Sequence, residues 1–134
     1  MDQVQQTFLP PVLVVQTGHP VEFRNNDDVL HNVKVREDAN GEGTFNVAIP
    51  TGEKFIFAFS RDGFYDVGCD IHPGMSAQIM ATSTPYSTLA DPQGAFAIND
   101  VPAGAYKAIA YSGDRKIERE VTVPVTSSLD LTAP

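Results

Sequence analysis

The amino-acid sequence predicts an all-β protein, and three observations support this prediction. The apolar runs are short and rich in Val, Ile and Phe, and none shows a long helical periodicity. Ten glycines and ten prolines among 134 residues supply the frequent turns that short strands need. A hydrophobic content of 42% is sufficient for a packed core, so the composition argues against a disordered chain.

Six strands are predicted in the first 84 residues, because each combines β-branched or aromatic side chains with flanking turn residues. The clearest is 31–35, where Val33 and Val35 alternate with polar side chains and therefore share one face of a sheet. A polar loop at 24–28 precedes this strand, and the charged, glycine-containing segment 37–43 is predicted as a turn. The six predicted strands are 12–15, 21–23, 31–35, 55–59, 64–67 and 77–82.

The character of the sequence changes near residue 84, which suggests two domains at 1–84 and 85–134. In the second part, turns are predicted at 91–94, 101–104 and 112–114, and strands at 95–98, 106–111, 117–123 and 128–131. About fifty residues are marginal for an independent core. We therefore expect the second part to pack on the first part or to share its strand 77–82.

One short segment combines three metal-binding side chains. The run Cys-Asp-Ile-His-Pro-Gly-Met begins at the single cysteine, Cys69, and includes His72 and Met75. One tight turn can direct Cys69 and His72 at the same point, and the Pro-Gly pair favours such a turn. His31 adds a second imidazole from another segment. One Cys and two His in a trigonal set, with a weak axial Met, form the ligand set of a blue-copper electron-transfer site.

Each of these residues taken alone would be an ordinary core or turn residue. Their spacing, their order and the strand-rich context together favour the copper site over two alternatives, a zinc site and a degenerate site that has lost its metal. Asn32 follows His31, and its side chain can tie this strand to the ligand loop.

The remaining histidine, the acidic residues and the cysteine count do not predict a second metal or catalytic site. His19 lies in a Gly-His-Pro turn and is expected at the surface, and Asp27 and Asp28 are predicted as solvated turn residues. Three histidines are too few for the additional substrate centre of a copper oxidase or nitrite reductase. One cysteine cannot supply a binuclear copper centre, an internal disulfide or the Cys-x-x-Cys-His motif of a c-type haem.

The composition also limits the classes of partner. Seventeen acidic and nine basic residues give a net charge of −8, which opposes nucleic-acid binding because that needs a basic face. The same charge favours a redox protein partner with a basic docking patch, since opposite potentials steer encounter. No apolar run approaches the roughly 18 residues of a membrane span.

Several stretches of the first part occur together in a known family. They are 18–27, 30–33, Pro50-Thr51-Gly52, Gly63-Phe64-Tyr65 and 69–75. On these stretches the chain resembles the cupredoxins, the group of plastocyanin and amicyanin, over about residues 7–83. The Cys-x-x-His-x-x-Met spacing is the short form, similar to amicyanin rather than to plastocyanin.

This resemblance implies a Greek-key β-sandwich with one type 1 copper ion at one end. It also implies that His31, Cys69 and His72 are the strong ligands and that Met75 is the axial ligand. The edge of His72 would be the electron port, surrounded by an apolar ring of Pro73, Gly74 and Leu30.

The second part resembles a different family. Residues 88–96 and 98–106 are similar to a carboxypeptidase regulatory-like module, which is a transthyretin-like β-sandwich. The opening strands of that module are missing, so the resemblance implies a truncated β extension. An ordinary β-meander is the alternative.

We therefore predict a copper protein that carries single electrons between redox partners and is not an enzyme. One alternative is a protein for copper delivery or resistance, although the three Met and three His form no metal-binding tract. Another is a β-sandwich interaction module with a vestigial metal site. We expect a periplasmic or otherwise extracytoplasmic protein whose single thiol is protected by metal, with no signal peptide in the sequence itself.

Overall fold

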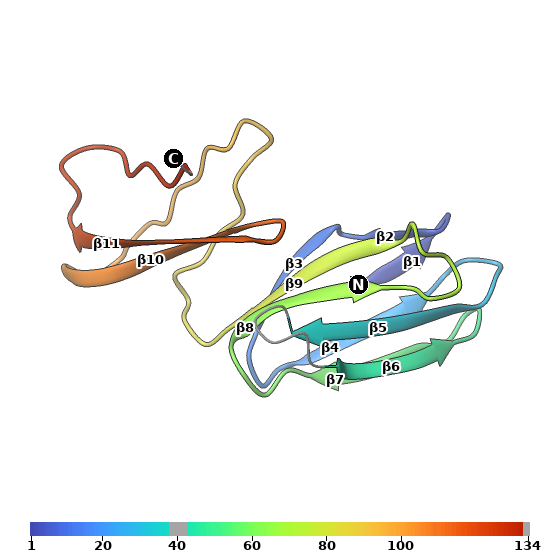
Figure 1. Cartoon of the computed structure of the whole chain (residues 1–134). Helices are drawn as coiled ribbons and strands as arrows, with labels where there is room; N and C mark the ends of the chain where they lie inside the picture. Colours follow the sequence, from blue (N-terminus) through green and yellow to red (C-terminus); the bar gives the residue numbers. More distant parts are fainter. Residues whose placement is uncertain (38–42, 133–134) are drawn as a thin grey trace. The chain divides into compact units, whose positions relative to one another are not determined.

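The computed structural model describes residues 1–37 and 43–132, and every helix or strand found in this part of the chain is a β-strand (Figure 1). The prediction of an all-β protein is therefore confirmed. The chain divides into two compact units, Met1–Ser87 and Thr88–Pro134. A search of the described residues for a helix long and apolar enough to cross a membrane finds none.

The first unit consists of two sheets, which Figure 1 shows as two layers. The four-stranded sheet has the order β2–β1–β4–β7, with β1 at Asp2–Val4, β2 at Thr7–Leu9, β4 at Pro20–Asn25 and β7 at Lys54–Ala58. The five-stranded sheet has the order β3–β9–β8–β5–β6, with β3 at Val12–Gln16, β5 at His31–Glu37, β6 at Gly43–Ile49, β8 at Gly63–Gly68 and β9 at Ser76–Thr82. The chain crosses repeatedly between the sheets, so strands far apart in the sequence become neighbours.

Alternation of side chains explains why the two sheets pack face to face. Val21 and Phe23 of β4 are buried in one core cluster with Val33 and Val35 of β5 and Ile79 of β9. Successive residues of a strand point to opposite faces, so these residues form the apolar face of each sheet. The core of the molecule therefore lies between the two layers of the first unit.

A row of aromatic rings closes the sandwich where the edge strands β6 and β7 meet. The ring centroid of Phe45 lies 5.2 Å from that of Phe55 and 4.6 Å from that of Phe57. Phe59 continues the row, at 5.1 Å from Phe57 and 4.6 Å from Tyr65 of β8. Aromatic pairs of this kind contribute about 0.5–1.5 kcal/mol beyond the burial of their area, so the row stabilises the side of the sandwich that has no backbone ladder.

All six strands predicted in the first part are present, with ends that differ by at most two residues. The strands β1, β2 and β6 were not predicted. β1 and β2 have three residues each, which is too short for alternation to be recognised. Of the predicted turn 37–43, Glu37 ends β5 and Gly43 begins β6, and residues 38–42 lie outside the described residues.

The second unit contains one β-hairpin. β10 (Gly104–Ser112) pairs with β11 (Arg115–Val123), and a two-residue loop joins Ser112 to Arg115. Gly113 in this loop has φ +60°, a conformation that glycine adopts without steric cost. The predicted strands 106–111 and 117–123 are confirmed. Those at 95–98 and 128–131 are wrong, because neither short segment finds a partner strand in the described part of the chain.

The expectation that strand 77–82 is shared with the second part is also wrong. This strand, β9, is hydrogen-bonded to β3 on one side and to β8 on the other, so both of its edges are occupied. The strands β10 and β11 form a separate two-stranded sheet. None of the described residues 88–132 is buried, and a lone hairpin has marginal stability in water.

The position of the core leads to a prediction with a matched control. Ile79 is 0% exposed and Ile56 is 52% exposed, although both lie in strands. We expect Ile79→Ala to lower the free energy of unfolding by about 2–5 kcal/mol, because it leaves a cavity. Ile56→Ala should change it by less than about 0.5 kcal/mol. Urea denaturation measures both values, and equal losses would contradict this description of the core.

Candidate metal centre

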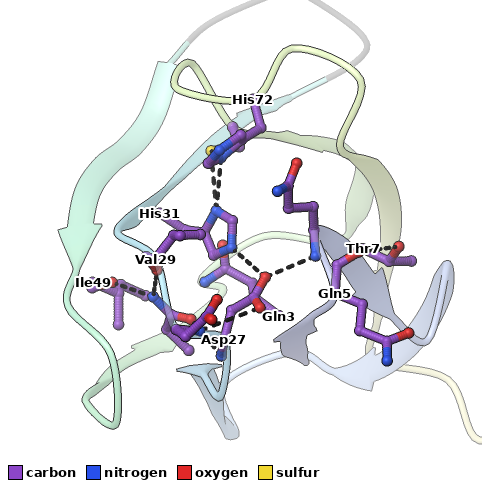
Figure 2. Close-up of polar contacts among 12 residues, drawn as sticks. Gln3, Gln5, Thr7, Asp27, Val29, His31, Ile49 and His72 are labelled. Carbon is purple, nitrogen blue, oxygen red and sulfur yellow. Dashed lines mark hydrogen bonds and ion pairs between the residues drawn. The ribbon is translucent and has the colours of Figure 1, made fainter.

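Three donor atoms from separate segments converge at one end of the sandwich. His31 begins β5, Cys69 directly follows β8, and His72 lies in the loop between β8 and β9. The Nδ1 atoms of His31 and His72 lie 3.0 Å apart (Figure 2). The Sγ of Cys69 lies 3.9 Å from the first of these nitrogens and 4.0 Å from the second. The structure thus brings together three of the four residues predicted from the sequence.

The triangle of donor atoms fits a small metal ion. The centre of the circle through the three atoms lies about 2.1 Å from each, close to the bond lengths of imidazole nitrogen and thiolate sulfur to zinc. Asp27 Oδ2 lies 2.9 Å from Nε2 of His31. Since a carboxylate accepts the hydrogen bond, Nε2 carries the proton and Nδ1 presents its lone pair. A thiolate with two imidazole nitrogens is a donor set that suits copper.

The three donors differ in their access to solvent. His31 is 0% exposed and Cys69 is buried, whereas His72 is partly exposed. Burial protects the thiolate from solution oxidants. Only His72 therefore connects the site with the surface.

The side chain of Asn32 ties β5 to the ligand loop, as predicted. Its Oδ1 accepts hydrogen bonds from the backbone N–H of Asp70 at 2.7 Å and of Ile71 at 3.3 Å, and lies 3.1 Å from the Cys69 sulfur. Its Nδ2 donates to Asn46 Oδ1 on β6 at 2.9 Å. The amide therefore fixes the direction of the cysteine before any metal binds.

The ligand loop is a compact turn that ends at Met75. The Met75 N–H donates to the His72 carbonyl at 2.9 Å, across the Pro73-Gly74 pair. The Met75 side chain is buried in the core cluster. Its role as the axial ligand stays a prediction.

Asp27 was expected to be a solvated turn residue, but its side chain is only 12% exposed and is bound to His31. Its Oδ2 accepts from His31 and, at 2.7 Å, from the backbone N–H of Gln6. These hydrogen bonds, the one from His31 first, hold the pKa of Asp27 below its ordinary value. The one feature of the sequence that could have indicated this contact is the four-residue spacing between Asp27 and His31. His19 is exposed in its turn, as predicted.

Comparison with known proteins agrees with this geometry. Residues 1–82 match the family described as copper binding proteins, plastocyanin/azurin family. Amicyanin from Paracoccus versutus is 27% identical over 74 residues, which cover 54% of this chain and 56% of that protein. This chain therefore spans about half the length of that curated relative.

Solved structures show the same fold. The crystal structure of amicyanin from Paracoccus versutus has a TM-score of 0.53 at 19% identity, covering 60% of this chain and 79% of that one. A copper-containing nitrite reductase from Thermus scotoductus has a TM-score of 0.52 at 28% identity, covering 60% of this chain and 22% of that one.

A two-sheet sandwich with a His–Cys–His site at one end defines a cupredoxin-type protein. The family match covers more than half of the chain, and the chain belongs to the copper-binding plastocyanin/azurin family. The predicted resemblance of the first part to cupredoxins is thereby confirmed, and the site fits one type 1 copper ion. The family match ends at residue 82, so the family of the second part stays a prediction.

The contacts of Asn32 predict a stability difference that needs no metal. Asn32→Ala would leave the loop N–H groups of Asp70 and Ile71 without their acceptor, so we expect a loss of about 1–3 kcal/mol in metal-free protein. Asn46→Ala is the comparison: Asn46 also donates to Asp70 of the loop, but this bond is exposed and water can replace it. Chemical denaturation measures both variants. A loss for Asn46→Ala that equals or exceeds the loss for Asn32→Ala would contradict the larger role given to Asn32.

Proposed function

We propose that this protein is a mononuclear type 1 copper protein that carries single electrons between redox partners. His31, Cys69 and His72 are the strong ligands, and Met75 is the weak axial ligand. The main support is the convergence of two imidazole nitrogens and one thiolate sulfur at separations of 3.0–4.0 Å. Copper, when bound, supplies the one-electron chemistry of the Cu(I)/Cu(II) couple.

The way the ligands are held suits electron transfer. Any movement of ligands between the two oxidation states must be repeated at each transfer, so a rigid donor set makes exchange faster. β5 and β8 are interior strands, each hydrogen-bonded on both sides. Asn32 then fixes the loop that follows β8. The protein therefore contributes geometry and burial, and no substrate turnover is required.

We assign electron entry and exit to His72, the donor residue that is partly exposed. The residues beside the ligands in the sequence include two large apolar side chains, Leu30 and Ile71, each 48% exposed. Pro73 and Gly74 are exposed as well. Exposed apolar side chains around such a ring suit a short-lived protein contact. Leu30, Ile71, Pro73 and Gly74 are called the apolar rim below.

Charge and thiol chemistry suggest the partner and the compartment. A net charge of −8 favours a redox protein with a basic docking patch. A thiol occupied by copper is compatible with an oxidising compartment, so we place the protein in the periplasm or in another extracytoplasmic location.

Two other functions make different predictions. A copper carrier for delivery or resistance would pass its metal readily to a chelator, and a vestigial interaction module would bind no stoichiometric copper. The fold is also found in an enzyme, the nitrite reductase named above. We propose a non-enzymatic role, because His19 is the one histidine left for a second centre in this chain.

We also propose that residues 85–134 form a β module appended to the copper domain 1–84. The Tyr106 hydroxyl donates to the Pro102 carbonyl at 2.7 Å. Tyr65 in the first unit donates in the same way to Arg61, four residues earlier. A tyrosine that bonds back to the chain at a corner is a feature of β-sandwiches, which supports a sandwich-like origin for this module.

The copper assignment is tested by adding Cu(II) to the copper-free protein. We expect one equivalent to bind with an intense thiolate-to-copper band in the visible spectrum and a type 1 spin-resonance signal. Cys69→Ser should abolish the band, whereas His19→Ala, which changes the exposed histidine, should leave it unchanged. A colourless wild-type protein would refute the proposal. Rapid loss of copper to a weak chelator would favour the carrier.

The electron port is tested by adding one charge at two exposed apolar positions. Leu30→Lys places the charge on the apolar rim, and Ile56→Lys places the same charge on β7, which carries no ligand. A unit charge several Å from the port should slow exchange with a cationic redox complex about threefold at low ionic strength. Stopped-flow kinetics measure the rates. Equal effects of the two variants would contradict a port at His72.

A further inference from the structure

The N-terminal β1–β2 hairpin reaches the metal site through a single carboxylate. Asp27 Oδ2 accepts from Nε2 of His31 at 2.9 Å and from the backbone N–H of Gln6 at 2.7 Å. Gln6 lies in the turn between β1 and β2, and Figure 2 shows a dashed line that joins Asp27 to this turn. Gln6 lies 21 residues before Asp27 in the sequence, yet its backbone holds the carboxylate that in turn holds His31.

The hairpin turn has an uncommon backbone conformation. Val4 pairs with Thr7, so Gln5 and Gln6 form a two-residue loop. Their φ angles are +52° and +55°, as in a type I′ turn, where glycine and asparagine are the usual residues. Glutamine is strained in this region. Strained residues persist where their surroundings fix them, and the bond from the Gln6 N–H to Asp27 is such a contact.

Both sides of this contact are fixed without metal. On the hairpin side, β1 runs parallel to β4, and the Asn26 N–H donates to the Gln3 carbonyl at 3.0 Å. The Asn26 side chain also donates to Asp2 Oδ2 at 2.6 Å. On the other side, the buried Asn25 accepts from the Asp27 N–H at 2.9 Å. The carboxylate is thus held in place by the fold itself.

We propose that Asp27 and the Gln5-Gln6 turn form a clamp that positions His31 and lowers the reduction potential of the copper site. This inference rests on the proposed function. The carboxylate keeps the proton on Nε2, so that Nδ1 stays free for the metal, and it makes the imidazole a stronger donor. A stronger donor and a nearby negative charge favour the more highly charged Cu(II). Asp27 and Gln6 are positioning residues, because they act only through His31.

The test compares two variants that make the same change in charge. Asp27→Asn removes the carboxylate of the clamp, and Asp28→Asn removes the exposed carboxylate one residue later. Partners of metal ligands typically change metal affinity tenfold or more. We expect Asp27→Asn to favour reduced copper about tenfold, which is about 59 mV for a one-electron couple. Asp28→Asn should shift the potential by less than a third of that. Equal shifts of the reduction potential in the two variants would contradict the proposed clamp.

The role of the hairpin is tested separately with Gln6→Pro. Proline lacks the N–H and cannot adopt a positive φ, so this variant should release Asp27 and raise the potential in the same direction as Asp27→Asn. An unchanged potential would exclude the hairpin from the clamp.

A second readout uses copper-free protein, so that it does not depend on the proposed function. We expect slow hydrogen exchange of the Gln6 amide in the wild type and in Asp28→Asn, and at least tenfold faster exchange in Asp27→Asn. Nitrogen NMR of the wild type at mildly alkaline pH should show the His31 proton on Nε2. Fast exchange in the wild type, or a proton on Nδ1, would overturn the inference. A wild type that binds no copper refutes the proposed function, and the exchange result then still decides whether the clamp exists.

Discussion

The hydrogen bonds of the Asn32 side chain join the two segments that carry the metal donors. β5 carries His31, and the segment after β8 carries Cys69 and His72, which lie 38 and 41 residues later in the sequence. Pairing of β5 with β8 brings these segments together, with Lys34 opposite Gly68. The pairing ends before the loop, and the Oδ1 of Asn32 then holds the N–H groups of Asp70 and Ile71. The Asp70 side chain adds contacts with Lys34 and Asn46, but Asn32 Oδ1 is the acceptor that holds the loop backbone beside His31.

The sandwich limits how far the ligands can move. Both strands that lead to the donors lie inside the five-stranded sheet, and their inward residues, Val35 and Val67, belong to the core cluster. Interiors packed at crystal-like density transmit strain rather than absorb it. In the proposed electron carrier, a change of oxidation state would therefore meet a donor set that is costly to rearrange.

Much of the first unit could be predicted from local pattern, and the rest depends on contacts between distant residues. Alternation identified β5, and the spacing of Cys69, His72 and Met75 identified a metal loop. β1 and β2 escaped prediction because three residues contain no readable period. The contact of Asp27 with the site was not predicted, because one of its partners is the backbone N–H of Gln6. Every residue except proline has such a group, so the sequence gives no signal for it. Segments 95–98 and 128–131 have strand-like composition but no partner strand in the part of the chain described, and composition alone does not make a strand.

The two histidines of the site have opposite surroundings, and in the proposed electron carrier this difference would separate two tasks. His31 is fully buried, with Nδ1 facing the other donors and Nε2 bound to Asp27. Both ring nitrogens of His31 are thus engaged, so Asp27 can adjust how strongly His31 would bind the metal. His72 is partly exposed beside the apolar rim, where a strong second partner such as a buried carboxylate would compete with a docking protein. A site that both tunes a potential and passes electrons is served better by dividing these tasks between the two rings than by giving both rings the same environment.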